Sequence, residues 1–113
     1  MIVYSVLITS TFDGEQMVLF TSLRKAVNFV KCQFNENIQH MFDEDQKEIE
    51  EYLNDNPENY PKYSEIKKEI NKKEEYPDNS WGTCIQTYDS YYITITKHDS
   101  KSPLWYNEQH GGF

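Results

Sequence analysis

Apolar and polar positions at the start of the chain change from a strand-like to a helix-like spacing. Residues 2–10 alternate with a period of two, and both faces of this extended segment are largely apolar. The pattern predicts a strand in the interior of a sheet. Asp13-Gly14 then favours a tight turn, because glycine tolerates a positive φ angle. Residues 17–20 predict the returning antiparallel strand.

A helix is predicted directly after this hairpin. Thr21 and Ser22 carry hydroxyl groups that can accept hydrogen bonds from the free N–H groups of a first helical turn. The apolar side chains that follow recur at helical spacing: Leu23, Ala26, Val27, Val30, Phe34 and Ile38. We interpret this stripe as core that faces the sheet, and a ligand groove is the less common alternative.

The composition becomes strongly acidic from Asp43 to Asp78, yet helical periodicity continues. We therefore expect a helical insertion, with a solvated linker as the alternative. Its first helix has a narrow apolar face that includes Phe42, and it should end before Pro57. Four carboxylates share another face of this helix: Glu44, Glu48, Glu51 and Asp55. Neighbours at this spacing have Cβ atoms roughly 5–6 Å apart, which predicts a continuous acidic stripe.

A second helical pattern in the insertion has a thinner apolar face. Ile66 and Ile70 lie one turn apart, and Ser64 is the expected N-cap. With so few apolar positions, we expect this helix to be held less firmly than the helix over residues 23–38. It would be partly exposed or would form an arm that faces a partner.

Two β-rich runs, residues 81–88 and 91–96, predict a second hairpin with Asp89-Ser90 at its turn. The second run has one apolar and one hydroxyl-rich face, which is typical of a half-exposed antiparallel strand. The tail contains Leu104-Trp105-Tyr106, and we expect these side chains to fold back over the sheet. A partner-binding segment is the alternative.

Together these patterns predict an α+β fold. It has a four-stranded antiparallel sheet from two hairpins, one long helix packed on the sheet, and two acidic helices inserted between the hairpins. A chain of 113 residues has room for one domain with one modest core. Its four segments are a strand–strand–helix unit (1–41), an acidic helical insertion (42–78), the second hairpin (79–98) and a C-terminal tail (99–113).

The formal net charge of −8 argues against non-specific affinity for nucleic acid or for an anionic membrane. We therefore expect no direct binding to either. The chain has no apolar run long enough to span a bilayer, and because its first residues predict a strand we expect no signal peptide. Cys32 and Cys84 lack CxxC spacing, so we expect a cytoplasmic protein with free thiols, and a disulfide is the minority alternative.

Motifs for catalysis or cofactor binding are absent, including GxGxxG, GxxxxGK[ST], GxSxG and HExxH. His40, His98 and His110 do not lie at a metal-ligand spacing, and Asp43-Glu44-Asp45 lacks the glycine and terminal Glu of an EF-hand loop. Facing strands can bring Cys84 near His98 as nucleophile and base, but nothing local to Cys84 indicates an activated thiol. We expect no enzymatic activity, no catalytic residue, no cofactor and no metal.

A row of carboxylates on a rigid helix presents charge much as the phosphates of a nucleic-acid strand do. The first functional hypothesis is therefore a binding protein that docks on the basic, nucleic-acid-binding surface of a protein partner. Tyr52, Tyr60 and Tyr63 would supply aromatic anchors between the charges. The common alternative is a charged helix face that meets only solvent.

Short length, strong acidity, a composition rich in Asn, Lys, Ile and Tyr, and the lack of a catalytic motif distinguish the chain as a whole. With the segments DEDQKEIEEYLND and WGTCIQTYDSYYITIT, the chain resembles the small acidic anti-CRISPR inhibitors of RNA-guided nucleases from phages and mobile elements. The resemblance shares no motif, so no residue role carries over. It implies a stoichiometric inhibitor, in the host-cell cytoplasm if phage-encoded, that blocks nucleic-acid loading or nuclease rearrangement.

The second hypothesis is a non-catalytic αβ regulatory module that binds a small ligand or self-associates through a sheet edge. The segment FTSLRKAVNFV suits such a scaffold, and four aromatic side chains would line its site: Tyr91, Tyr92, Trp105 and Tyr106. Added salt separates the two hypotheses, because only docking on a basic partner should weaken steeply with salt.

Overall fold

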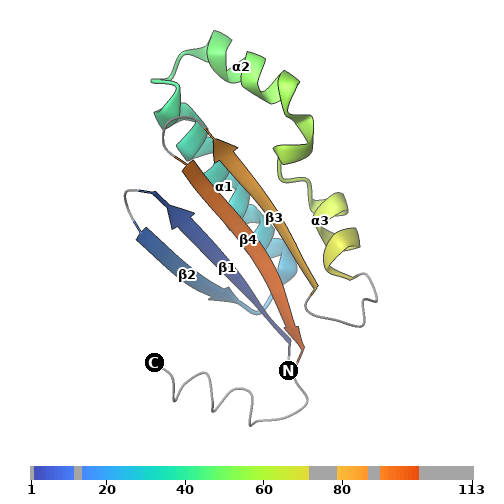
Figure 1. Ribbon diagram of the computed structural model, residues 1–113. Helices are drawn as coiled ribbons and strands as arrows, with labels where there is room; N and C mark the ends of the chain where they lie inside the picture. The colour runs from blue at the N-terminus through green and yellow to red at the C-terminus, as the bar shows by residue number, and fades with distance from the viewer. Residues whose placement is uncertain (1, 12–13, 72–78, 87–89, 100–113) are drawn as a thin grey trace.

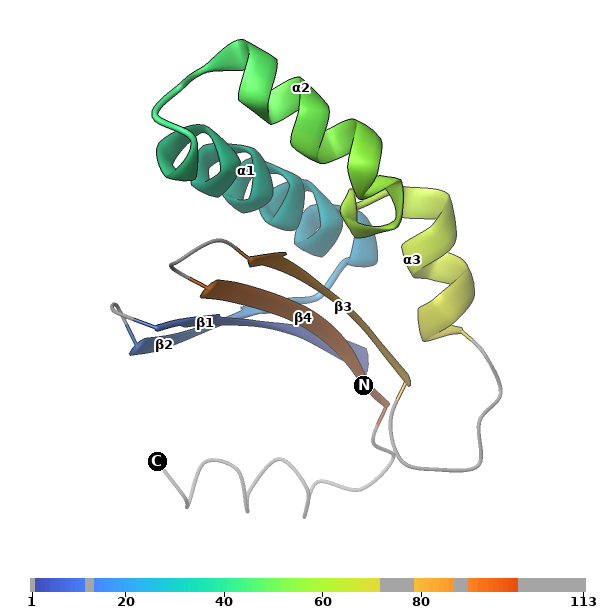
Figure 2. The same ribbon diagram turned by 45° about the horizontal axis from the view of Figure 1, so that its top comes forward.

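The chain folds into a sheet of four antiparallel strands, and the described helices lie on one face of that sheet (Figures 1 and 2). The computed structural model describes residues 2–11, 14–71, 79–86 and 90–99. Its elements in chain order are β1 (Ile2–Ser10), β2 (Gly14–Phe20), α1 (Leu23–Met41), α2 (Gln46–Asp55), the 3-10 helix η1 (Pro57–Asn59), α3 (Tyr63–Ile70), β3 (Asn79–Gln86) and β4 (Ser90–Asp99). The predicted α+β class and four-stranded antiparallel sheet are confirmed.

The strand order is β2-β1-β4-β3, and each neighbouring pair is antiparallel. β1 therefore lies in the interior of the sheet, as its two apolar faces predicted. The register places Val6 opposite Ile95 and Ile8 opposite Ile93. Because side chains alternate along a strand, these four point to the same face, where they are buried beneath the helices.

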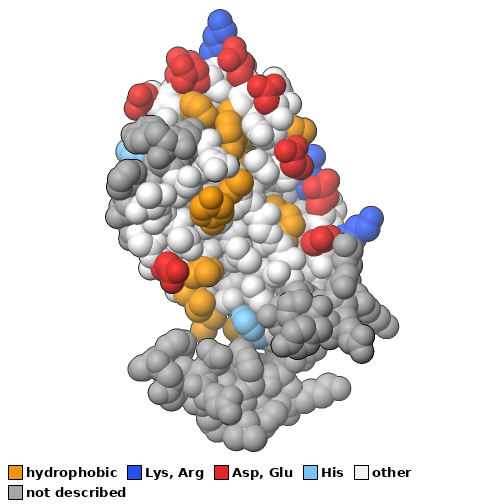
Figure 3. Space-filling model, in the orientation of Figure 1, with side chains coloured by type: hydrophobic (Ala, Val, Ile, Leu, Met, Phe, Trp, Pro, Cys, Tyr) orange, Lys and Arg blue, Asp and Glu red, His pale blue; other side chains and the backbone are white. Residues whose placement is uncertain are grey.

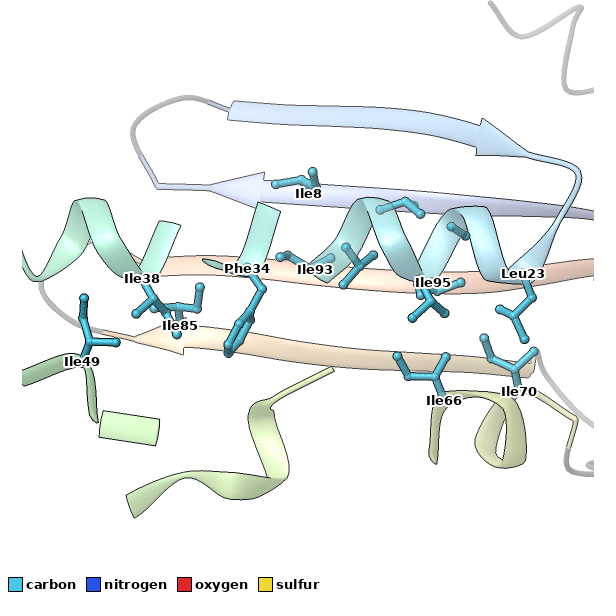
Figure 4. Packing of buried hydrophobic residues seen from close by; sticks show 14 residues of the cluster. Ile8, Leu23, Phe34, Ile38, Ile49, Ile66, Ile70, Ile85, Ile93 and Ile95 are labelled. Atoms are coloured by element: carbon cyan, nitrogen blue, oxygen red, sulfur yellow. The ribbon is translucent and has the colours of Figure 1, made fainter. Parts of the chain in front are cut away.

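Helix α1 supplies the largest share of the core. Ser22 has extended backbone angles, and its side chain accepts a hydrogen bond from the N–H of Lys25, so the predicted hydroxyl cap is present. The stripe from Leu23 to Ile38 is buried against the sheet, with Phe34 at its centre and fully buried (Figure 4). The interpretation of this stripe as core, and not as a ligand groove, is confirmed.

Helix α3 packs against the core through its two isoleucines. Ile66 and Ile70 are both fully buried and belong to the same core cluster as the stripe of α1. They fill the space between α1 and β3, near Leu23 (Figure 4). The alternative of a partly exposed helix is therefore the one that the structure shows: α3 packs into the core on one face and is exposed on the other, and it buries fewer side chains than α1. The predicted cap is wrong: the helix begins at Tyr63, and its N-cap Lys62 makes no side-chain capping bond.

The other face of the sheet has no described helix over it, and we call it the open face (Figure 2). The pairing register places these described side chains on it: Val3, Ser5, Leu7, Thr9, Glu15, Met17, Leu19, Ser80, Cys84, Gln86, Ser90, Tyr92, Thr94, Thr96 and His98. Hydroxyl groups from β1 and β4 make up much of this surface, as the half-exposed pattern of residues 91–96 predicted. Figure 3 shows the molecule from this side.

Candidate functional site

Helix α2 begins later than the sequence pattern predicted. It starts at Gln46, and its N-cap is Asp45, whose carboxylate accepts hydrogen bonds from the N–H of Lys47 at 3.0 Å and of Glu48 at 3.3 Å. Phe42, which the prediction placed on the apolar face of this helix, is instead the C-cap residue of α1. The Asp45 carboxylate satisfies two N–H groups that would otherwise lack a partner, and this fixes the start of the helix.

Two residues with positive φ angles separate α1 from α2. Asp43 has a φ angle of 51° and Glu44 one of 61°, a left-handed backbone conformation that residues other than glycine seldom adopt. Glu44 therefore lies in the turn, whereas Glu48, Glu51 and Asp55 lie on the helix. We call these four carboxylates the acidic row, of which three positions are helical and one belongs to the turn before the helix.

The fold holds α2 in place through its other faces. Ile49 is buried in the core, and Tyr52 is half-buried with its ring 5.3 Å from the ring of Phe42. The hydroxyl group of Tyr52 donates a hydrogen bond of 3.4 Å to the carbonyl oxygen of Cys84 on β3. Helical spacing places Tyr52 one turn from both Ile49 and Glu48. Tyr52 therefore marks the boundary between the buried face of α2 and the acidic row.

The acidic row lies on the surface of the molecule. All four side chains are exposed to solvent, and the structure records no ion pair for any of them within its described residues. Figure 3 shows acidic side chains gathered along the edge of the molecule formed by α2 and α3. The lysines of α3 do not neutralise this row, so the carboxylates of α2 face solvent as a group.

The three tyrosines expected to anchor a partner are packed within the fold. Tyr60 meets Phe34 edge-on, with the ring centres 5.7 Å apart. The guanidinium group of Arg24 lies 4.2 Å from the ring centre of Tyr63, a cation–π geometry. Like Tyr52, both are half-buried against the core. Only the exposed parts of these rings are free to meet a partner.

A polar contact that the sequence did not predict joins the two inner strands, β1 and β4. Ser5 Oγ and His98 Nε2 lie 2.8 Å apart on the open face, where the β1–β4 register makes these residues diagonal neighbours. Serine next to histidine is the pair that acyl-transfer enzymes use, but a nucleophile must reach its substrate. Ser5 is only 5% exposed, so the contact serves to satisfy a buried hydroxyl group.

Cys84 and His98 are too far apart to act together as nucleophile and base. Cys84 lies opposite Tyr92, which is six residues from His98 along β4, or roughly 20 Å at strand spacing. Both cysteines are free, as expected, with Cys32 exposed on α1. Of the aromatic site in the regulatory-module hypothesis, the two described members point to opposite faces of the sheet: Tyr91 packs against the core and Tyr92 points to the open face. Residues 105 and 106, the other members of that site, lie outside the described residues.

A surface hollow of about 530 Å³ lies between α3 and β3. Its lining combines acidic, basic and aromatic side chains: Glu65, Lys68, Glu69, Ser80, Trp81 and Gly82. The mixture of both charges favours no single class of ion. In the part of the chain that the structure describes, no three His, Cys, Asp or Glu side chains come together as metal ligands would.

Comparisons of this chain with protein-family models, curated proteins and solved structures found no match. Among the described residues, no helix combines the length and the apolar character that crossing a membrane requires.

Proposed function

We propose that this protein is a small acidic binding protein that inhibits a nucleic-acid-binding enzyme stoichiometrically. The contact is made by the acidic row on a basic surface of the enzyme. One observation carries the proposal: Glu48, Glu51 and Asp55 are exposed and form no ion pair with another described residue, on a helix that Ile49 and Tyr52 fix to the core.

The spacing of the acidic row supports imitation of a polyanion. Helical rise places successive carboxylates from Glu48 to Asp55 roughly 4.5–6 Å apart along the axis. The phosphates of one DNA strand recur about every 3.4 Å along the duplex, which is the same order of spacing. Arginine pairs well with carboxylates as with phosphates, so a basic groove shaped for nucleic acid can accept this row.

The mode of action follows from long-range attraction. Charge complementarity speeds the encounter with a basic protein and disfavours acidic partners. The resemblance to anti-CRISPR inhibitors suggests an RNA-guided nuclease as the partner class, and the cytoplasm of the host cell as the place of action. The proposal involves no catalytic step and no cofactor, because occupation of the basic surface is sufficient for inhibition.

Two variants of equal net charge test the proposal. The row variant E44Q/E48Q/E51Q/D55N removes four negative charges from the acidic row. The control E15Q/E36Q/E58Q/E65Q removes four from exposed positions elsewhere, so both variants have a formal net charge of −8 + 4 = −4. The measurement is binding of each variant and of the unmodified chain to a purified RNA-guided nuclease that lacks its guide.

We expect the row variant to lose on the order of 100-fold in affinity, about 2.7 kcal/mol, and the control to lose much less. Equal losses in both variants would show that only net charge matters. If the unmodified chain does not bind the nuclease, this partner class is wrong.

A further inference from the structure

The open face of the sheet carries several large apolar side chains that are exposed to solvent. Met17 is 55% exposed, Leu19 is 59% exposed and Tyr92 is 47% exposed. The register places Met17 directly opposite the half-buried Leu7, with Leu19 and Tyr92 at diagonal positions around Leu7. Cross-strand neighbours on one face are in contact range, so these side chains are adjacent. We call Leu7, Met17, Leu19 and Tyr92 the open-face patch.

The charge of the open face differs from that of the rest of the molecule. Although the chain has a formal net charge of −8, Glu15 and His98 are the ionisable groups among the side chains that the structure describes on this face, beside the thiol of Cys84 and the phenol of Tyr92. An antiparallel strand that faces water normally presents polar side chains. Exposed methionine and leucine at neighbouring positions of β2 therefore indicate a surface that another segment covers.

We propose that the chain's own residues 100–113 cover the open face, with Leu104-Trp105-Tyr106 seated on the open-face patch. This segment begins where β4 ends, at Asp99, and β4 is an inner strand of the sheet. The chain therefore leaves the sheet at the end of an inner strand, from which the open face is within reach. The segment contains one lysine and one glutamate, so its side chains add almost no net charge on a nearly uncharged surface.

The reach of the segment matches the position of the patch. Across β1, Leu19 lies at the same height along the sheet as Thr96 on β4, three residues before Asp99. Met17 lies at the same height as Thr94, five residues before Asp99. These separations are roughly 10 and 17 Å at strand spacing. Five to seven extended residues from Asp99 to Leu104-Trp105-Tyr106 span roughly 17–23 Å, which is enough to return to these levels.

Tethering favours this segment over other occupants. A short tether holds its end at an effective concentration in the millimolar range. A second copy of the chain would have to reach the same patch at its much lower bulk concentration. It follows that the open face is occupied within each molecule, which leaves the acidic row as the surface that a partner meets.

Fluorescence of Trp105 in the full chain tests this proposal. The contribution of Trp105 is the difference between the spectra of the unmodified chain and W105F, since Trp81 is present in both. We expect blue-shifted emission and shielding from acrylamide. In M17E/L19E the emission should move to the red and quenching should rise several-fold. The control N28E/N35E places the same added charge on exposed positions of α1 and should change neither property.

Emission from a solvent-exposed indole in the unmodified chain would overturn the proposal, as would an M17E/L19E spectrum identical to that of the control. A blue shift that disappears on dilution, together with a dimer in sedimentation, would assign the patch to a second copy. If circular dichroism shows that M17E/L19E does not fold, Leu19→Asn alone replaces it. These variants retain the acidic row, so a failure here is separate from a failure of nuclease binding.

Discussion

Helices α2 and α3 lie next to each other in the chain, but their sequences serve different needs. α3 buries Ile66 and Ile70 completely, and its exposed positions mix lysine with glutamate. α2 buries Ile49 alone and presents carboxylates that pair with no cation in the described part of the chain. Like charges three and four residues apart destabilise a helix, so folding does not explain the composition of α2. The difference indicates that α3 serves stability, whereas the exposed carboxylates of α2 fit the contact surface that we propose.

The largest effect is expected from a variant that disrupts the packing of α3. Ile66→Ala removes a fully buried side chain between α1 and β3 and should lower the free energy of unfolding by about 3–4 kcal/mol. Ile49→Ala should cost less, about 2 kcal/mol, because α2 contributes less to the core. Urea unfolding of both variants measures the difference. A larger loss for Ile49→Ala than for Ile66→Ala would reverse the roles assigned to the two helices.

A smaller effect concerns the start of each helix. Asp45→Ala removes the side-chain cap of α2 and should destabilise the protein by about 1 kcal/mol. Ser64→Ala is the matched control, because Ser64 is exposed inside α3 and caps nothing; its effect should stay within about 0.5 kcal/mol. Thermal or urea unfolding measures both. A loss for Ser64→Ala equal to that for Asp45→Ala would restore the cap predicted from sequence.

The smallest effect is expected from variants that test the difference in charge between α2 and α3. Glu51→Gln removes repulsion with Glu48 and Asp55, which attraction to Lys47 one turn away only partly offsets, and should stabilise the protein by about 0.2–0.5 kcal/mol at low salt. The gain should shrink as salt is added. Glu65→Gln in α3 should be nearly neutral, since Lys68 and Glu69 oppose each other one turn away. If Glu51→Gln destabilises the protein, Glu51 makes a favourable contact and the acidic row has a structural role.

Local patterns predicted the parts of the fold that local physics determines. The alternation in residues 2–10, the hydroxyl cap at Ser22 and the stripe of α1 each depend on neighbours in the chain, and each appears in the structure. The start of α2 was not predicted correctly, because Phe42 fits the helical spacing of both α1 and α2. Only the positive φ angles of Asp43 and Glu44 place Phe42 at the end of α1.

The remaining features depend on contacts between distant segments. Ser5 meets His98 because β1 pairs with β4, which no local pattern specifies. The firm burial of Ile66 and Ile70 likewise requires α1 and β3 to be in place first. For the candidate site, spacing placed Glu48, Glu51 and Asp55 together on α2, but it could not show that Glu44 belongs to a turn or that the rings of Tyr60 and Tyr63 pack against the core.

The salt dependence of binding tests the central claim most directly. The affinity of the unmodified chain for a guide-free RNA-guided nuclease should fall steeply as salt rises, because the contact replaces counterions on a basic surface. The slope should flatten in the row variant E44Q/E48Q/E51Q/D55N and stay close to the original in the control E15Q/E36Q/E58Q/E65Q. Binding that is insensitive to salt, or slopes that change equally in both variants, would contradict the account.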